Sequence, residues 1–249
     1  MGAVCQQLTH LYNDGTLIKD DAQFKAARAL DKLLARVPKD APNFLERLFK
    51  SSKTPKGLYM WGGVGRGKSM MMDWFFDAAP IKQKRRTHFH AFMLDVHARI
   101  NAYRKDKSSG DPIGPVAKDI ADEAHLLCFD EFHVTDITDA MILSRLFEAL
   151  WARGVIVVAT SNRPPIDLYK HGLNRNLFEP FIEMMPKHLI IHEFVGDKDH
   201  RLRQLTAAPV YYAPLGPKCR RSCLRRLGRF LLLPLVFSLR NRYARLLDP

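Results

Sequence analysis

Residues 57 to 76, GLYMWGGVGRGKSMMMDWFF, place four glycines and a Lys-Ser pair between two apolar runs. The segment fits the pattern G-x-x-x-x-G-K-[ST], in which backbone N–H groups surround a β-phosphate, the lysine reaches the β/γ-phosphate oxygens and the hydroxyl binds Mg²⁺. An apolar strand pattern precedes it and a helical pattern follows, which favours a nucleotide-phosphate site over a flexible turn. The expected binding residues are Gly62, Gly63, Val64, Gly65, Arg66, Gly67, Lys68 and Ser69.

Two acidic residues, Asp130 and Glu131, follow the apolar run LLCF. A carboxylate at the end of a buried strand is where P-loop proteins hold Mg²⁺, which predicts Asp130 as a metal ligand beside Ser69. The next residue, Glu131, is placed to polarise an attacking water as a general base. The alternative is an ordinary strand end with two solvated acids. The phosphate-loop pattern upstream favours the catalytic interpretation.

A third polar group, Asn162, ends the apolar run VIVVATSN. Its amide could hydrogen-bond a water that lies between Glu131 and the γ-phosphate. It could equally cap the turn that precedes Pro164 and Pro165. The residue types alone leave both interpretations open.

Other metal-binding patterns are weak. In a strand THFHAF, His88 and His90 would share one face, but no carboxylate cluster is near them in sequence, so we interpret them as structural or partner-facing. Cys219 and Cys223 stand four apart, which is too few ligands for a structural zinc site. The chain has four cysteines, a usage that fits free thiols in a reducing compartment.

The elements that must position these groups alternate along the chain. Apolar runs predict strands at 58–62, 87–92, 125–131, 154–162 and 188–194. Amphipathic segments predict helices across most of 5–50 and at 68–77, 93–105, 115–123 and 138–153. Strands that alternate with helices in this way predict an α/β protein with a parallel sheet and right-handed crossovers.

The net charge of +13 would suggest nucleic-acid binding if it were evenly distributed. Residues 219–249 hold eight arginines and one acid, however, which leaves +6 for the first 218 residues. The body of the chain is therefore only mildly basic and gives no strong nucleic-acid signal. No apolar run reaches about 18 residues, and the N-terminus lacks a signal-peptide pattern, so we expect a cytoplasmic protein.

Three passages, GLYMWGGVGRGKS, LLCFDEFHVTDITDAMIL and VATSNRPP with the GLNR that follows it, together resemble the ZapE family of AAA-type P-loop ATPases. That family comprises a bacterial cell-division ATPase and its mitochondrial relatives. The resemblance runs from about residue 8 to about residue 217. It implies an N-terminal helical segment (1–56), an AAA-type ATPase core (57–205), and ATP and Mg²⁺ as cofactors.

The resemblance also assigns roles to residues. Lys68 and Ser69 become the Walker A residues, Asp130 and Glu131 become Walker B, and Asn162 becomes the sensor of the γ-phosphate.

Arg175, in GLNR, falls where AAA enzymes carry the arginine finger that is offered to a neighbouring subunit's nucleotide. Such a finger requires a homo-oligomeric ring. The alternatives are a solvated arginine beside Glu179, and Arg163 as a weaker candidate for the finger.

The sequence from Cys219 onward departs from the family pattern. It is arginine-rich and lysine-free, with an apolar run from Phe230 to Phe237. We interpret residues 206–249 as an unrelated basic tail that arose by a shifted reading frame or a natural truncation. The C-terminal lid of the ATPase is then expected to be missing, with Arg201 and Arg203 as the last candidates for a second sensor. The tail itself could contact a membrane surface, which would place the protein peripherally at the inner membrane.

The resulting prediction is an ATP-hydrolysing AAA-type enzyme linked to cell division or protein remodelling, with division-apparatus proteins or another protein substrate as partners. Two other functions remain open. One is a nucleic-acid-associated P-loop ATPase; the other is a truncated nucleotide-binding module without turnover.

Overall fold

The computed structural model describes residues 1–39, 54–105 and 110–194. The chain divides into two units, Met1–His200 and Arg201–Pro249, and all described residues belong to the first. The expected basic tail, 206–249, and the second-sensor candidates lie outside the described residues. The predicted domain boundaries therefore stay predictions.

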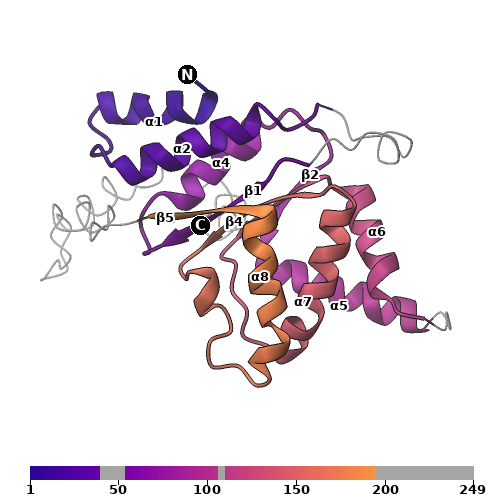
Figure 1. The fold of residues 1–249 in the computed structure, drawn as a ribbon. Coiled ribbons are helices and arrows are strands. Elements are labelled where there is room, and N and C mark those ends of the chain that lie inside the picture. The colour runs from indigo at the N-terminus through magenta and orange to yellow at the C-terminus, as the bar shows by residue number, and fades with distance from the viewer. Residues whose placement is uncertain (40–53, 106–109, 195–249) are drawn as a thin grey trace, which may run out of the picture. The chain divides into compact units, whose positions relative to one another are not determined.

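Strands and helices alternate in the described part of the chain, as the sequence predicts (Figure 1). The strands are β1 (Gly57–Gly62), β2 (Lys84–His88), β3 (Leu126–Asp130), β4 (Ile156–Ser161) and β5 (Leu189–Phe194). The helices are α1 (Ala3–Asn13), α2 (Asp21–Leu34), α4 (Lys68–Ala78), α5 (Phe89–Lys105), α6 (Ile113–Glu123), α7 (Ile137–Ala152) and α8 (Glu179–His188). Two single 3₁₀ turns, η1 (Pro165–Asp167) and η2 (Arg175–Leu177), lie between β4 and α8.

The strands form one sheet in the order β2-β3-β4-β1-β5, and every pairing is parallel. In a parallel sheet all carboxyl ends meet at one edge, where open α/β sheets bind their ligands. Because β4 lies between β3 and β1, the segments that follow these three strands become neighbours. The sheet therefore brings the three candidate motifs of the sequence to one edge.

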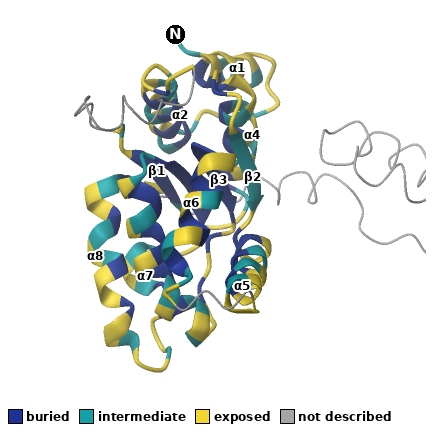
Figure 2. Cartoon of the chain, turned by 90° about the vertical axis from the view of Figure 1, so that its right-hand side faces the viewer, coloured by how far each residue is buried: buried dark blue, intermediate teal, exposed yellow. Residues whose placement is uncertain are grey.

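Helices cover both faces of this sheet (Figure 1). Successive side chains of a strand point to opposite faces, so Leu58 and Val158 pack with α1, α2 and α4, whereas Tyr59 and Phe129 pack with α5 to α8. All residues of β3 and β4 are buried, as expected for strands covered on both sides. In Figure 2 the inner strands β1 and β3 are dark blue, the edge strand β2 is teal, and the outward faces of the helices are largely yellow.

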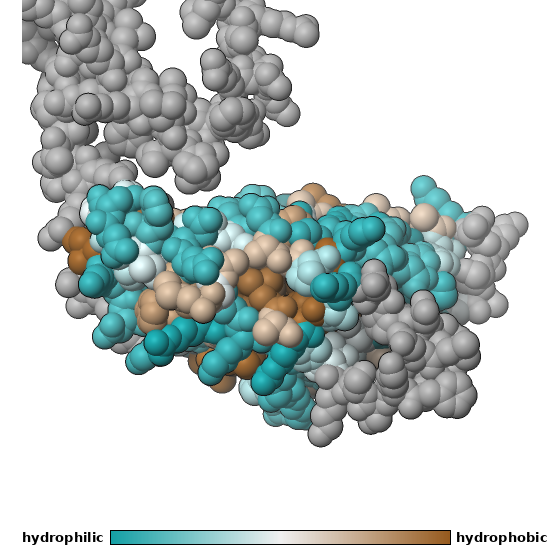
Figure 3. Space-filling model, turned by 90° about the horizontal axis from the view of Figure 1, so that it is seen from above, coloured by the Kyte–Doolittle hydropathy of each residue, from teal (hydrophilic) through white to brown (hydrophobic). Residues whose placement is uncertain are grey.

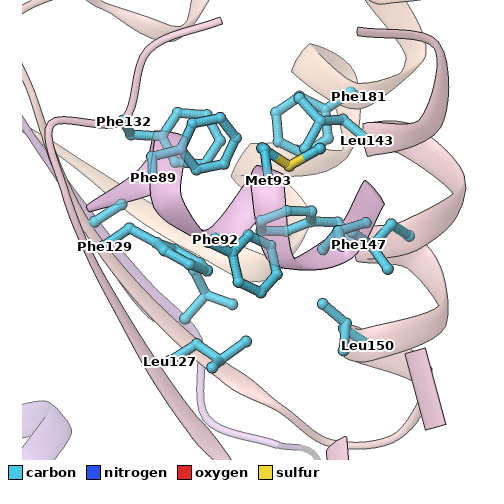
Figure 4. Close-up of a cluster of buried hydrophobic side chains, with 14 of the residues drawn as sticks. Phe89, Phe92, Met93, Leu127, Phe129, Phe132, Leu143, Phe147, Leu150 and Phe181 are labelled. Atoms are coloured by element: carbon cyan, nitrogen blue, oxygen red, sulfur yellow. The ribbon is translucent and has the colours of Figure 1, made fainter. Parts of the chain in front are cut away.

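An aromatic cluster fills the layer between the sheet and helices α5, α7 and α8 (Figure 4). Phe132 lies at its centre, with ring centroids 4.0 Å from Phe89 and 6.0 Å from Phe181. Aromatic pairs at such distances add specific contacts to the burial of apolar area. Since Phe132 follows Glu131 directly, its packing fixes the chain just beyond the two candidate acids.

The expected strand at 87–92 is wrong in its bounds. The strand β2 covers 84–88, and the chain turns into α5 at Phe89. Phe92, Met93 and Val96 are buried with Phe89 at helical spacing, and burying this face requires a helix. His90 consequently lies on a helix and does not share a strand face with His88. The start of β2 escaped prediction because its lysine and arginines do not form an apolar run.

The face that is seen from above in Figure 3 is largely hydrophilic, with a hydrophobic area near its middle. In the ranges 1–39, 54–105 and 110–194, no helix combines the length and hydropathy that a membrane span requires.

Candidate functional site

The phosphate loop joins the end of β1 to the start of α4. Gly62 has a φ of 146° and Gly67 a φ of 80°, values that side-chain-bearing residues rarely adopt. A Cβ on Gly62 would also lie 2.8 Å from the Cβ of Phe194. The two glycines thus permit a tight turn that ends at the N-terminus of α4. Loop N–H groups and the N-terminal end of a helix together favour a bound phosphate.

Lys68, the first residue of α4, reaches back over the loop. Its ammonium donates to the main-chain oxygens of Gly62 and Gly63, each at 2.7 Å, and to Oδ1 of Asn162 at 3.2 Å. The side chain is buried, with 8% of the residue exposed. The contact joins the loop after β1 to the residue after β4, which are 94 residues apart in sequence.

Asn162 is held in place by its neighbours. The hydroxyl of Ser161 donates to the carbonyl of Phe132 at 2.8 Å and accepts from the N–H of Arg163 at 3.1 Å. The hydroxyl of Tyr59 donates to the carbonyl of Arg163 at 2.9 Å. These bonds fix the main chain on both sides of Asn162, so that its amide oxygen faces Lys68. Its role as a γ-phosphate sensor stays a prediction.

Asp130 ends β3 and is 9% exposed. Its carboxylate is held at two points by Arg86 of β2: Nε donates to Oδ2 at 2.7 Å and a terminal nitrogen donates to Oδ1 at 3.3 Å. The other terminal nitrogen of Arg86 contacts Asp73 of α4. The predicted metal ligand therefore has a positively charged neighbour that the sequence did not reveal.

Glu131 has an unusual backbone. Its φ is 55°, in the left-handed region that a residue with a long side chain seldom adopts. Its N–H donates to the hydroxyl of Thr160 at 3.2 Å, and the next N–H, that of Phe132, donates to the carbonyl of Thr160 at 2.7 Å. The kink turns the chain away from β3 and leaves the Glu131 side chain exposed. Such strained residues occur often at functional sites.

A residue of α2 and the residue that caps this helix support the phosphate loop from the N-terminal segment. Gln23 of α2 is 1% exposed, and its amide donates to the carbonyl of Arg66 at 2.9 Å. The side chain of Arg66 is itself buried and lies 3.5 Å from the carboxylate of Asp20. Arg66, expected only as part of the loop, thus anchors the loop to α2.

Asp20 also caps α2, because its Oδ1 accepts from the N–H of Ala22 at 2.8 Å. We expect Asp20→Ala to lower the free energy of unfolding by about 1 kcal/mol, the usual effect of losing such a cap. Asp20→Asn should retain most of that stability, since asparagine caps equally well. Denaturant unfolding of both variants checks this; equal destabilisation by the two would show that the charge facing Arg66 matters more than the cap.

Arg175 lies apart from these contacts. Its guanidinium donates to the carbonyl of Leu168 at 2.8 Å and to that of Ile166, so it ties η2 to the segment around η1. The arginine thus forms main-chain hydrogen bonds within its own loop and is only partly exposed. Neither these bonds nor the position of Arg163 tests the finger assignment, which stays a prediction.

The residues present fit a Mg²⁺–nucleotide complex. Ser69 is exposed on the first turn of α4, and Asp130 offers a carboxylate at the adjoining strand end. Oxygen ligands of this kind suit Mg²⁺, which takes its remaining ligands from water and substrate phosphates. Among the described residues, no group of three or more His, Cys, Asp or Glu side chains could hold a metal ion.

Comparison with known proteins agrees with these features. Residues 3–233 match the family model of the AFG1-like ATPases. The chain belongs to the AFG1-like ATPase family. It is 40% identical over 222 residues to the cell division protein ZapE of Escherichia coli K12, which confirms the resemblance seen in the motifs. The family match ends at residue 233, beyond residue 217, where the resemblance seen in the sequence was expected to end.

Each curated relative is longer than the matched region. The alignment with ZapE covers 84% of this chain and 58% of that protein. The zebrafish (Danio rerio) lactation elevated protein 1 homolog B is 46% identical over 172 residues, which cover 66% of this chain and 34% of that protein. The matched region thus spans little more than half the length of ZapE and about a third of the zebrafish protein.

Solved structures show the same fold. The replication initiator DnaA, bound to AMPPCP and single-stranded DNA, matches with a TM-score of 0.51 and 14% identity, over 93% of this chain and 67% of that one. Domain III of DnaA from Thermotoga maritima matches with a TM-score of 0.50 and 13% identity, over 78% and 74% of the two chains. This confirms the predicted AAA-type P-loop core, and at such low identity it concerns the fold alone.

Proposed function

We propose that this chain binds ATP together with Mg²⁺ and hydrolyses the bond between the β- and γ-phosphates. The contact of Lys68 with Gly62, Gly63 and Asn162 carries the proposal, because it gathers the phosphate loop and the candidate sensor around one buried cation. Membership of the AFG1-like ATPase family supports it independently.

In this proposal, Lys68 and the loop N–H groups bind the β- and γ-phosphate oxygens and orient the γ-phosphorus. Ser69 and Asp130 would hold Mg²⁺, which supplies positive charge to the phosphates when bound. Glu131 accepts a proton from water as the water oxygen attacks the γ-phosphorus. The bond from phosphorus to the bridging oxygen breaks, and ADP and inorganic phosphate leave. Asn162 orients the water or contacts the γ-phosphate.

The direct test is phosphate release from ATP by the whole chain, measured with Mg²⁺ and with EDTA. We expect turnover with Mg²⁺ and none with EDTA. Binding of a fluorescent ATP analogue without any phosphate release would contradict hydrolysis and favour a nucleotide-binding module. No binding at all would contradict the phosphate-loop assignment itself.

We further propose a cytoplasmic role in cell division or protein remodelling, with division-apparatus proteins as partners. The 40% identity to the E. coli cell division protein ZapE supports this role for the shared part of the two chains. Co-sedimentation with a polymerised tubulin-like division protein is the expected result. Turnover that rises with DNA and not with such polymers would instead favour a nucleic-acid-associated ATPase. Contact of residues 206–249 with the inner membrane stays a subsidiary proposal, tested by vesicle sedimentation.

If Arg175 is an arginine finger, it acts on the nucleotide of a neighbouring subunit, so two inactive variants should complement each other when they assemble. Arg175→Ala should lose turnover and keep nucleotide binding. Glu131→Gln subunits still carry Arg175, and Arg175→Ala subunits still carry Glu131. Mixing the two variants should therefore restore part of the turnover at mixed interfaces, measured as phosphate release above the sum of the separate samples.

The matched control is Arg104→Ala, which removes an exposed arginine of α5 and should not alter turnover. A mixture that does no better than its components would show that Arg175 acts within its own chain. Its bonds to the carbonyls of Ile166 and Leu168 would then be its main role.

A further inference from the structure

Arg86 lies between the two elements that carry the proposed metal ligands. It belongs to the edge strand β2, where it pairs with Cys128 of β3 in the sheet register. Its guanidinium extends toward the carboxyl end of β3 and holds both oxygens of Asp130. The remaining terminal nitrogen contacts Asp73. One side chain thus joins β3 to α4.

The arrangement on α4 makes this bridge specific. Asp73 comes four residues after Ser69, and residues four apart lie on the same face of a helix. Arg86 therefore ties the face of α4 that carries Ser69 to the strand end that carries Asp130. A guanidinium suits this task because its donors form a rigid planar fork, which a lysine lacks.

The bridge is also partly shielded from water. The side chains of Arg86 and Asp130 are 22% and 12% exposed. The Arg86 guanidinium faces two carboxylates, those of Asp130 and Asp73. The contact is therefore a charge-assisted, two-point pair, which is stronger and more directional than an exposed ion pair.

We propose that Arg86 is a positioning residue for Mg²⁺: it orients the Asp130 carboxylate and fixes its separation from Ser69. The proposal rests on the proposed ATPase function, because the metal is bound together with the nucleotide. A carboxylate has about four acceptor positions, so two bonds to Arg86 leave positions for a metal. Groups that hydrogen-bond a metal ligand in this way set its orientation.

The test is the Mg²⁺ concentration that half-maximally tightens binding of a fluorescent ATP analogue. For Arg86→Gln we expect this concentration to rise by about 10- to 100-fold, the usual effect of losing a residue that orients a metal ligand. Nucleotide affinity in EDTA should not change, because Lys68 and the loop are untouched. Arg86→Lys keeps the charge and only one contact, and should give an intermediate value.

Arg85→Gln is the matched control. Arg85 neighbours Arg86 on β2, but its guanidinium pairs with Asp95 of α5 at 2.8 Å. Its loss should leave the Mg²⁺ requirement unchanged. If Arg86→Gln does not fold, Asp73→Asn removes the other anchor of the bridge from a half-exposed position, and should raise the requirement in the same direction by less.

Two results would overturn the proposal. An unchanged Mg²⁺ requirement in the folded Arg86 and Asp73 variants would show a purely structural bridge. A lowered requirement would show that Arg86 competes with the metal for Asp130. Failure of the ATPase proposal looks different. If nucleotide binding fails, the unsubstituted chain binds no analogue in EDTA or in Mg²⁺; if only hydrolysis fails, it binds the analogue but releases no phosphate from ATP.

Discussion

Replacing Lys68 with alanine is expected to weaken ATP binding by at least about 100-fold. The lysine would form two or more hydrogen bonds to phosphate oxygens, and each bond to a charged group contributes about 1.5–3 kcal/mol. A loss of about 3 kcal/mol corresponds to a factor of more than 100 in the dissociation constant. Titration of a fluorescent ATP analogue, in EDTA and in Mg²⁺, measures the effect.

Lys82→Ala provides the comparison, because Lys82 is an exposed lysine that follows α4. It should bind the analogue like the unsubstituted chain. The Lys68 variant also loses the bonds to Gly62 and Gly63, so thermal unfolding must accompany the titration. A folded Lys68→Ala chain with unaltered affinity would refute the phosphate-loop assignment.

Glu131→Gln should separate binding from turnover. Glutamine preserves the size of the side chain, and the bond from the backbone N–H to Thr160 does not involve the carboxylate. We therefore expect nucleotide affinity to be retained. Turnover should fall by about 10²- to 10⁴-fold, the range that general-base catalysis contributes. Steady-state phosphate release and analogue binding, measured on the same sample, provide both values.

Glu148→Gln, on the exposed face of α7, is the matched control for this substitution. It should leave turnover unchanged. Undiminished turnover in Glu131→Gln would mean that another group activates the water, and the strained φ of Glu131 would then need a different explanation.

The sequence predicted the parts of the site that depend on local pattern. Asp130 ends β3, Asn162 directly follows β4, and Lys68 comes after the loop that leaves β1. These inner strands are largely buried on both faces, and such strands appear as continuous apolar runs. The position of each strand end could therefore be predicted, and so could a parallel sheet. The start of β2 could not, because an edge strand buries less and carries Lys84, Arg85 and Arg86.

The remaining contacts depend on strand order, which the sequence pattern does not contain. Asn162 meets Lys68 because β4 pairs directly with β1. Arg86 meets Asp130 because β2 pairs with β3, although the two residues are 44 apart in sequence. Nothing in the sequence indicated that Gln23 contacts the phosphate loop, because a polar residue in an amphipathic helix is normally expected to face solvent. Only its burial beneath Arg66 identifies it.

The hydrogen bond from Gln23 to Arg66 would link α2 thermodynamically to the nucleotide site, if the phosphate loop binds nucleotide as proposed. A molecule that binds α1 and α2 and shifts Gln23 would change the free energy of the phosphate loop, and with it the affinity for nucleotide. Linkage is reciprocal, so nucleotide would alter the affinity for that molecule by the same factor. Under the proposed function, α2 would thus sense the bound state of a loop that lies well beyond it in the sequence.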